Sequence, residues 1–212
     1  MKLKKGLLTV FSVLPLVVSG IALFFLPDRI PGHYGADMTV DRYGSKYEIL
    51  IFPPIILIIG LIFLLAAKLI QEEPNKRITL NIGLALVLFF NALNYFVLYV
   101  QANAIKDIGK FGFNRFLLLA FGVFFIFIGN LMPMVRKNAF IGMRTKWSMK
   151  NDAVWKKCQL FAGVSMIVTG VICGVLAFAW PELFAMVGVL IAVVIVNVIY
   201  SYIAAKKYEN KE

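Results

Sequence analysis

Long apolar runs alternate with short charged segments along the whole chain. Each of six runs has about 20 residues with no charged side chain well inside it, the length a helix needs to cross a hydrocarbon core about 30 Å thick. The pattern therefore predicts six transmembrane helices. They cover Gly6–Leu26, Ile49–Ala67, Ile78–Val100, Phe113–Pro133, Gln159–Ala179 and Leu183–Ile203.

The composition supports a membrane protein. Hydrophobic residues make up 61% of the 212 residues, charged residues only 16%, and the mean hydropathy is +0.85. A soluble domain is near 45–50% apolar and about a quarter charged. We therefore expect an all-α fold: one polytopic membrane domain over residues 1–212, a bundle of six transmembrane helices that includes an uncleaved first helix.

The distribution of basic residues predicts the orientation. Residues 1–5, 68–77, 134–158 and 204–212 hold 16 of the 22 Lys and Arg. The positive-inside rule then predicts that both termini are cytoplasmic. Topology and attraction to anionic lipid headgroups account for the net charge of +11, so no direct nucleic-acid partner is expected. Trp147, Trp155 and Trp180 lie outside the apolar runs, as expected of anchors at the membrane interface.

The polar residues inside the apolar runs are mainly amides: Asn81, Asn91, Asn94, Asn130 and Asn197. We interpret them as hydrogen-bonding groups between helices. The alternative is a small transporter or channel, whose polar path would be lined by all of these except Asn81.

Glycines mark one face of the predicted fifth helix. Gly163, Gly170 and Gly174 form a small-residue stripe that includes a G-x-x-x-G motif. Such a stripe predicts close packing, here against the predicted sixth or fourth helix.

The outer loop, residues 27–48, holds the single histidine of the chain, His33. Asp37 and Asp41 follow it at four-residue intervals, a spacing that on a helix would align three ligands for a divalent cation. Pro31 and Gly35 instead favour turns. We expect His33 to make a local hydrogen bond, with a metal site and a pH-sensing or peptide-contacting role as alternatives.

The inner loop, residues 134–158, is more organised. Pro133 should end the fourth helix, and Ser148 or Asn151 can cap the next, whose first turn carries Asp152. Basic and large apolar side chains are interleaved between these points. Two interpretations stay open: an interfacial segment in the headgroups, or a docking surface for a cytoplasmic partner.

Catalytic patterns are missing from the sequence. It has no G-x-S-x-G, H-E-x-x-H or C-x-x-C motif, and its two cysteines, Cys158 and Cys173, are too far apart on one predicted helix to form a disulfide. We predict neither an enzyme nor a bound cofactor or metal.

Two segments of the chain resemble known sequence families. The inner-loop run Gly129-Asn130-Leu131-Met132-Pro133, with Arg136-Lys137-Asn138, Phe140-Ile141-Gly142, Arg144-Thr145, Trp147 and Trp155, resembles the SdpI family. The outer-loop residues Pro27-Asp28, Ile30-Pro31, His33, Asp41, Tyr43-Gly44 and Lys46 resemble the domain of unknown function found ahead of that region. We accordingly divide the chain into an N-terminal two-helix region, 1–67, and an SdpI-like region, 113–203.

The resemblance implies an immunity protein of the bacterial cytoplasmic membrane. Such a protein protects its producer from a secreted peptide toxin and, in the best-known system, sequesters a cytoplasmic helix-turn-helix autorepressor at the membrane. Besides membrane lipids, the implied partners are therefore the toxin and that autorepressor. The implied toxin-facing residues are Pro31, His33, Asp41, Tyr43 and Lys46. The implied partner-facing residues are Asn130, Arg136, Lys137, Asn138, Gly142, Arg144, Thr145, Lys146, Trp147 and Trp155.

Overall fold

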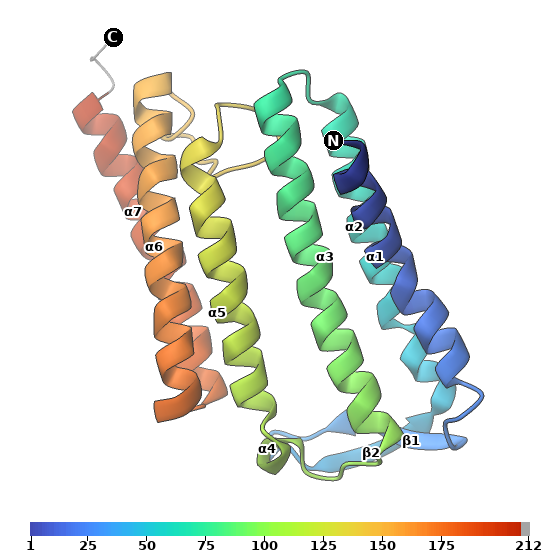
Figure 1. Cartoon of the computed structure of the whole chain (residues 1–212). Coiled ribbons are helices and arrows are strands. Elements are labelled where there is room, and N and C mark those ends of the chain that lie inside the picture. The colour runs from blue at the N-terminus through green and yellow to red at the C-terminus, as the bar shows by residue number, and fades with distance from the viewer. Residues whose placement is uncertain (209–212) are drawn as a thin grey trace.

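The computed structural model describes residues 1–208, and within them six helices are long and apolar enough to cross a membrane (Figure 1). The helical membrane fold is thus confirmed, and α3, α6 and α7 extend beyond the apolar runs that predict them. The long helices are α1 (Lys2–Ala22), α2 (Phe52–Leu69), α3 (Glu73–Ala102), α5 (Phe113–Leu131), α6 (Asp152–Ala179) and α7 (Leu183–Tyr208). The short elements are β1 (Arg29–Tyr34), β2 (Val40–Ser45), η1 (Lys46–Leu50), α4 (Ile108–Phe111) and η2 (Met132–Met134).

The long helices form two groups joined along one seam. Helices α1, α2 and α3 pack on one another, α6 packs on both α5 and α7, and α3 meets α5 between the groups (Figure 1). Phenylalanines pack across this seam. The ring centroid of Phe89 lies 4.8 Å from that of Phe121, and Phe96 stacks on Phe116 at 4.4 Å. The seam therefore holds the two groups together largely by aromatic packing.

A proline in α1 explains one of the buried asparagines. Pro15 has no N–H, so the carbonyl of Phe11, four residues earlier, lacks its helical donor. Asn91 of α3 supplies it, because its Nδ2 donates to Phe11 O at 3.0 Å and also to Val87 O at 2.8 Å. This hydrogen bond fixes α1 against α3 and confirms an interhelical role for Asn91.

The other intramembrane amides differ in role. Asn81 accepts from Lys4 Nζ at 2.7 Å, and Asn197 donates to Ser165 Oγ at 2.8 Å, so both also link helices. Asn130, by contrast, is exposed and donates to Ile126 O of its own helix. Asn91 and Asn94 lie on α3, whereas Asn197 lies on α7 in the other group. Asn197 lines a groove near the inner loop, whereas Asn94 lines a different cavity beneath the β1–β2 hairpin.

The closest helix contact is between α5 and α6 and is made through glycine. A methyl group on Gly163 would lie 2.7 Å from Gly129 O, and one on Gly170 would lie 2.6 Å from Gly122 O. The predicted glycine stripe therefore packs against α5, the fourth transmembrane helix. Gly174 differs. Within residues 1–208, apart from its chain neighbours and the nearby backbone of its own helix, no atom lies within 4 Å of a methyl group placed there.

The outer loop folds into a β-hairpin, which the sequence analysis did not predict. Strands β1 and β2 pair antiparallel with irregular register on either side of His33. The hairpin is held by its surroundings: Ile30 is fully buried, Tyr34 Oη donates to Ile105 O at 2.8 Å, and Val40 N donates to Lys106 O at 2.9 Å. Tertiary contacts thus override the turn-forming prolines and glycines of the segment.

The two ends of the bundle differ in character (Figure 1). One carries the hairpin, α4 and the Trp180–Glu182 connection, and we call it the hairpin end. The other carries residues 1–5, 68–77, 134–158 and 204–208, and we call it the basic end. The segments assigned by charge to one side of the membrane therefore do lie together. That the basic end is cytoplasmic remains a prediction.

Candidate functional site

The hairpin carries two side-chain pairs next to each other. His33 Nδ1 lies 2.7 Å from Asp41 Oδ1, and both side chains are exposed, as is Tyr43 two residues further along β2. Arg42 is the cross-strand partner of His33, and its guanidinium donates to both Glu48 carboxylate oxygens, at 2.9 and 3.0 Å. The local hydrogen bond expected of His33 is confirmed.

Asp37, the middle residue of the suggested metal triad, is bonded to Thr39 rather than to His33. It accepts from Thr39 Oγ1 at 2.7 Å and from Thr39 N at 3.1 Å, and these hydrogen bonds hold the pKa of Asp37 below its usual value. Within residues 1–208 no three His, Cys, Asp or Glu residues gather as metal ligands. The geometry at His33 is that of a hydrogen-bonded pair at a surface.

Of the toxin-facing candidates, His33, Asp41 and Tyr43 are exposed. Pro31 is buried, and its carbonyl accepts from Gln101 Nε2 at 3.2 Å. Lys46 is partly buried, and its Nζ lies 2.9 Å from Asp28 Oδ1. Pro31 and Lys46 thus shape the hairpin more than they present a surface.

Hydrogen bonds from three helices fix the inner loop. On α3, Asn75 accepts from Arg136 N at 3.0 Å and donates to Arg136 O at 3.2 Å. On α6, Gln159 accepts from Met143 N at 2.9 Å and donates to Met143 O at 3.1 Å. On α7, Ser201 accepts from Thr145 Oγ1 at 3.0 Å. The loop therefore has a defined conformation that hydrogen bonds to three helices hold in place.

Side chains of the loop complete its fold. Asn138 Oδ1 accepts from the N–H groups of Phe140 and Ile141, at 2.7 and 2.9 Å, which stabilises a tight turn. Ser148 Oγ accepts from Thr145 N at 2.8 Å, and Asn151 caps α6 by accepting from Val154 N at 2.8 Å. The cap predicted at Ser148 or Asn151 is thus made by Asn151.

Trp155 is the largest correction to the sequence analysis. It is 1% exposed, packs with Ile78, Leu131 and Ile141, and its Nε1 donates to Val135 O at 2.7 Å. It is neither an interfacial anchor nor accessible to a partner, because it forms the core between the loop and α6. Trp180, by contrast, is 61% exposed, as an anchor requires.

Accessible basic side chains remain on the loop. Arg136, Arg144 and Lys146 are exposed, and Lys137 is partly so. Lys146 Nζ lies 4.9 Å from the ring centroid of Trp147, which itself packs on Tyr202.

The remaining partner-facing candidates stabilise the fold or lie outside the loop. Gly142 adopts a φ of 105° beside Trp155, Thr145 and Asn138 bond within the protein, and Asn130 lies on the exposed side of α5.

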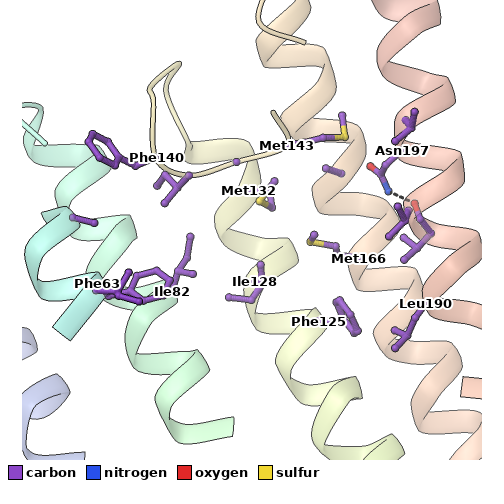
Figure 2. Close-up of a pocket in the computed structure, with 18 residues that line it drawn as sticks. Phe63, Ile82, Phe125, Ile128, Met132, Phe140, Met143, Met166, Leu190 and Asn197 are labelled. Atoms are coloured by element: carbon purple, nitrogen blue, oxygen red, sulfur yellow. Dashed lines mark hydrogen bonds between the residues drawn. The ribbon is translucent and has the colours of Figure 1, made fainter. Parts of the chain in front are cut away.

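A groove of about 620 Å³ runs beneath the inner loop, between the two helix groups (Figure 2). Phe63 of α2 and Ile82 of α3 lie toward one end, and Leu190 and Asn197 of α7 toward the other. Phe140 and Met143 of the loop also line the groove. Its lining is almost wholly apolar, so it is suited to acyl chains rather than to polar chemistry.

Sequence reasoning missed Asn75, Gln101, Gln159 and Ser201. They belong to no motif. The sequence shows only that each is a polar residue near the end of an apolar run. Their roles depend on which backbone groups the fold brings opposite them.

The comparisons with known proteins cover both ends of the bundle. Residues 134–201 match the SdpI/YfhL protein family, and residues 10–58 match a domain of unknown function, DUF1648. The chain is 26% identical over 213 residues to the "Immunity protein SdpI" of Bacillus subtilis (strain 168), an alignment that covers 99% of this chain and 98% of that protein. No solved structure matches the chain. With a DUF1648 region that includes the hairpin and an SdpI region that includes the inner loop, the chain is similar to SdpI proteins in both parts, and its similarity to a membrane immunity protein and its six membrane-length helices indicate a multi-pass protein of the cytoplasmic membrane.

Proposed function

We propose that this chain is a membrane immunity protein that protects the bacterium producing it from a secreted peptide toxin. The observation that carries the proposal is the similarity to an immunity protein over 99% of the chain, which spans the hairpin, the bundle and the inner loop.

The hairpin end has the surface that an amphipathic peptide at the outer leaflet would meet. Phe24 and Phe25, just before β1, are 88% and 83% exposed. The exposed polar side chains of His33, Asp41 and Tyr43 lie on the hairpin that follows. An amphipathic peptide needs apolar and polar contacts at the same depth of the interface. This arrangement supports toxin binding or exclusion at the hairpin.

Survival of sensitive cells tests the proposal. Cells that make this chain should grow in culture supernatant of the strain carrying the gene, whereas cells with an empty vector should not. A variant with alanine at His33, Asp41 and Tyr43, present in the membrane at the same level, should lose most of the protection. Equal killing of cells with and without the chain would contradict an immunity function.

The same structure suggests how toxin binding would be relayed inward. Helix α3 touches the hairpin through Gln101, which donates to Pro31 O, and touches the inner loop through Asn75, which bonds Arg136. A relay requires two arrangements that toxin binding distinguishes. We infer that a shift of α3 changes the inner loop and thereby the display of Arg144, Lys146 and Trp147 to an autorepressor.

Replacing Asn75 with alanine should uncouple the two ends. The variant should still protect cells, because the hairpin is unchanged, but toxin should no longer bring the helix-turn-helix regulator to the membrane. Recruitment is measured with a fluorescent regulator. Asn103→Ala is the control, since Asn103 is exposed near the other end of α3 and donates only to Tyr99 O. Normal recruitment by the Asn75→Ala protein would refute a relay through α3.

A further inference from the structure

A small cavity with several polar lining residues lies beneath the hairpin, and neither His33 nor Asp41 lines it. Its volume is about 220 Å³, smaller than the roughly 300–1,000 Å³ of typical small-molecule pockets. A cavity of this size suits a single side chain. Its polar lining residues are Ser19 of α1, Asn94 and Gln101 of α3, Arg42 of β2 and Glu48 of η1.

Two buried polar groups in this lining have no protein partner. Ser19 is 1% exposed and Asn94 is 5% exposed. Within residues 1–208 neither Ser19 Oγ nor Asn94 Nδ2 has a hydrogen-bond partner. An unpaired buried polar group destabilises the folded protein, so nearly all such groups in proteins are satisfied. Their shared position in one cavity indicates that a guest satisfies them.

The charged groups at the cavity already neutralise each other. Arg42 is bound bidentately to Glu48 and also donates to Gly32 O at 3.0 Å. The absence of side chains at Gly32 and Gly44 makes room for this pair. A methyl group on Gly32 would lie 2.8 Å from Glu48 Oε2, and one on Gly44 would overlap the same carboxylate. The cavity therefore offers hydrogen bonds without net charge.

We propose that this cavity binds an uncharged primary amide of a peptide that approaches from the hairpin end, such as an asparagine or glutamine side chain or an amidated terminus. The carbonyl of an amide accepts from Asn94 Nδ2, and its NH₂ donates to Ser19 Oγ. The proposal rests on the proposed function in taking that peptide to be the toxin.

Asn94→Leu separates a binding role from a structural one. Leucine has a similar volume and removes the unpaired donor, so the unfolding midpoint in detergent should be unchanged or higher, while protection against toxin should be lost. Asn91→Leu is the matched control one turn away on α3. It removes the donor to Phe11 O and should lower the midpoint by about 3 °C or more. If Asn94→Leu lowers the midpoint as much as Asn91→Leu does, or protects cells as well as the wild type, the proposal is overturned.

A second measurement does not depend on toxin. Val97→Cys, at a lining residue that supplies neither proposed hydrogen bond, is prepared in a chain with Cys158 and Cys173 replaced by alanine, and a small thiosulfonate reagent is added from the hairpin end. Labelling should occur, and propionamide near its dissociation constant should slow it about twofold. Sodium propionate, of similar shape but charged, should not.

Absence of labelling, or equal slowing by propionamide and propionate, would overturn the proposed cavity site. No slowing by either compound would also overturn it, because water alone would then fill the cavity. If the amide slows labelling but the wild-type chain protects no cells, the immunity function fails and the amide site stands.

Discussion

Gly163→Ala is expected to lower the free energy of unfolding by about 1–3 kcal/mol, the usual cost of overpacking a well-packed interface. The added methyl group would lie 2.7 Å from Gly129 O and 2.9 Å from the ring of Pro133. A backbone carbonyl and a proline ring cannot rotate away, so α5 and α6 would have to separate. For a chain of this length the unfolding midpoint should fall by about 2–12 °C.

Gly174→Ala is the control on the same helix. Within residues 1–208, apart from its chain neighbours and the nearby backbone of its own helix, no atom lies within 4 Å of the added methyl group. Alanine also stabilises a helix by about 1 kcal/mol relative to glycine. Its midpoint should therefore stay level or rise. Thermal unfolding of the two purified variants checks the prediction. Equal midpoints for both would mean that α5 and α6 do not approach as closely as the structure has them.

Trp155→Ala should have the largest effect of any single change in the inner loop. It removes a side chain that is 1% exposed, together with the hydrogen bond to Val135 O. Truncating a buried tryptophan costs about 3–5 kcal/mol. We expect a lower unfolding midpoint and rapid proteolysis within residues 134–151, because the loop would lose its core.

Trp155→Phe separates the contribution of packing from that of the hydrogen bond to Val135 O, and Trp180→Ala is the control for an exposed tryptophan. Phenylalanine keeps most of the packing but leaves Val135 O unpaired, a cost of about 1–3 kcal/mol. Trp180 is 61% exposed, so its replacement should leave the loop intact. If Trp155→Ala were no more sensitive to protease than Trp180→Ala, the loop would not depend on this core.

The transmembrane helices were predictable because their signal is local. A run of about 20 apolar residues has few alternatives to a membrane helix. The glycine stripe was informative for a similar reason, since only close packing explains small residues at that spacing. Gly163 and Gly170 do meet α5, while Gly174 shows that the spacing alone does not say which member makes the tightest contact.

The hairpin and the hydrogen bonds that hold the inner loop depend on residues far apart in the sequence. Pro31 and Gly32 are typical of turns, yet they lie in β1, which pairs with β2, and Gln101 donates to Pro31 O while Lys106 O accepts from Val40 of β2. Trp155 has the sequence surroundings of an interfacial anchor, and its burial follows from the way residues 135–141 fold back over α6. Long-range hydrogen bonds of this kind have no signature in a single sequence.

The orientation of the bundle is the claim on which the assigned roles depend, and cysteine labelling in intact cells tests it most directly. Tyr43→Cys and Lys146→Cys are placed separately in the chain with both buried native cysteines replaced by alanine. A maleimide that cannot cross the membrane should label residue 43 in intact cells and residue 146 only after the membrane is opened. Labelling of residue 146 alone in intact cells would contradict the account, because the hairpin would then face the cytoplasm.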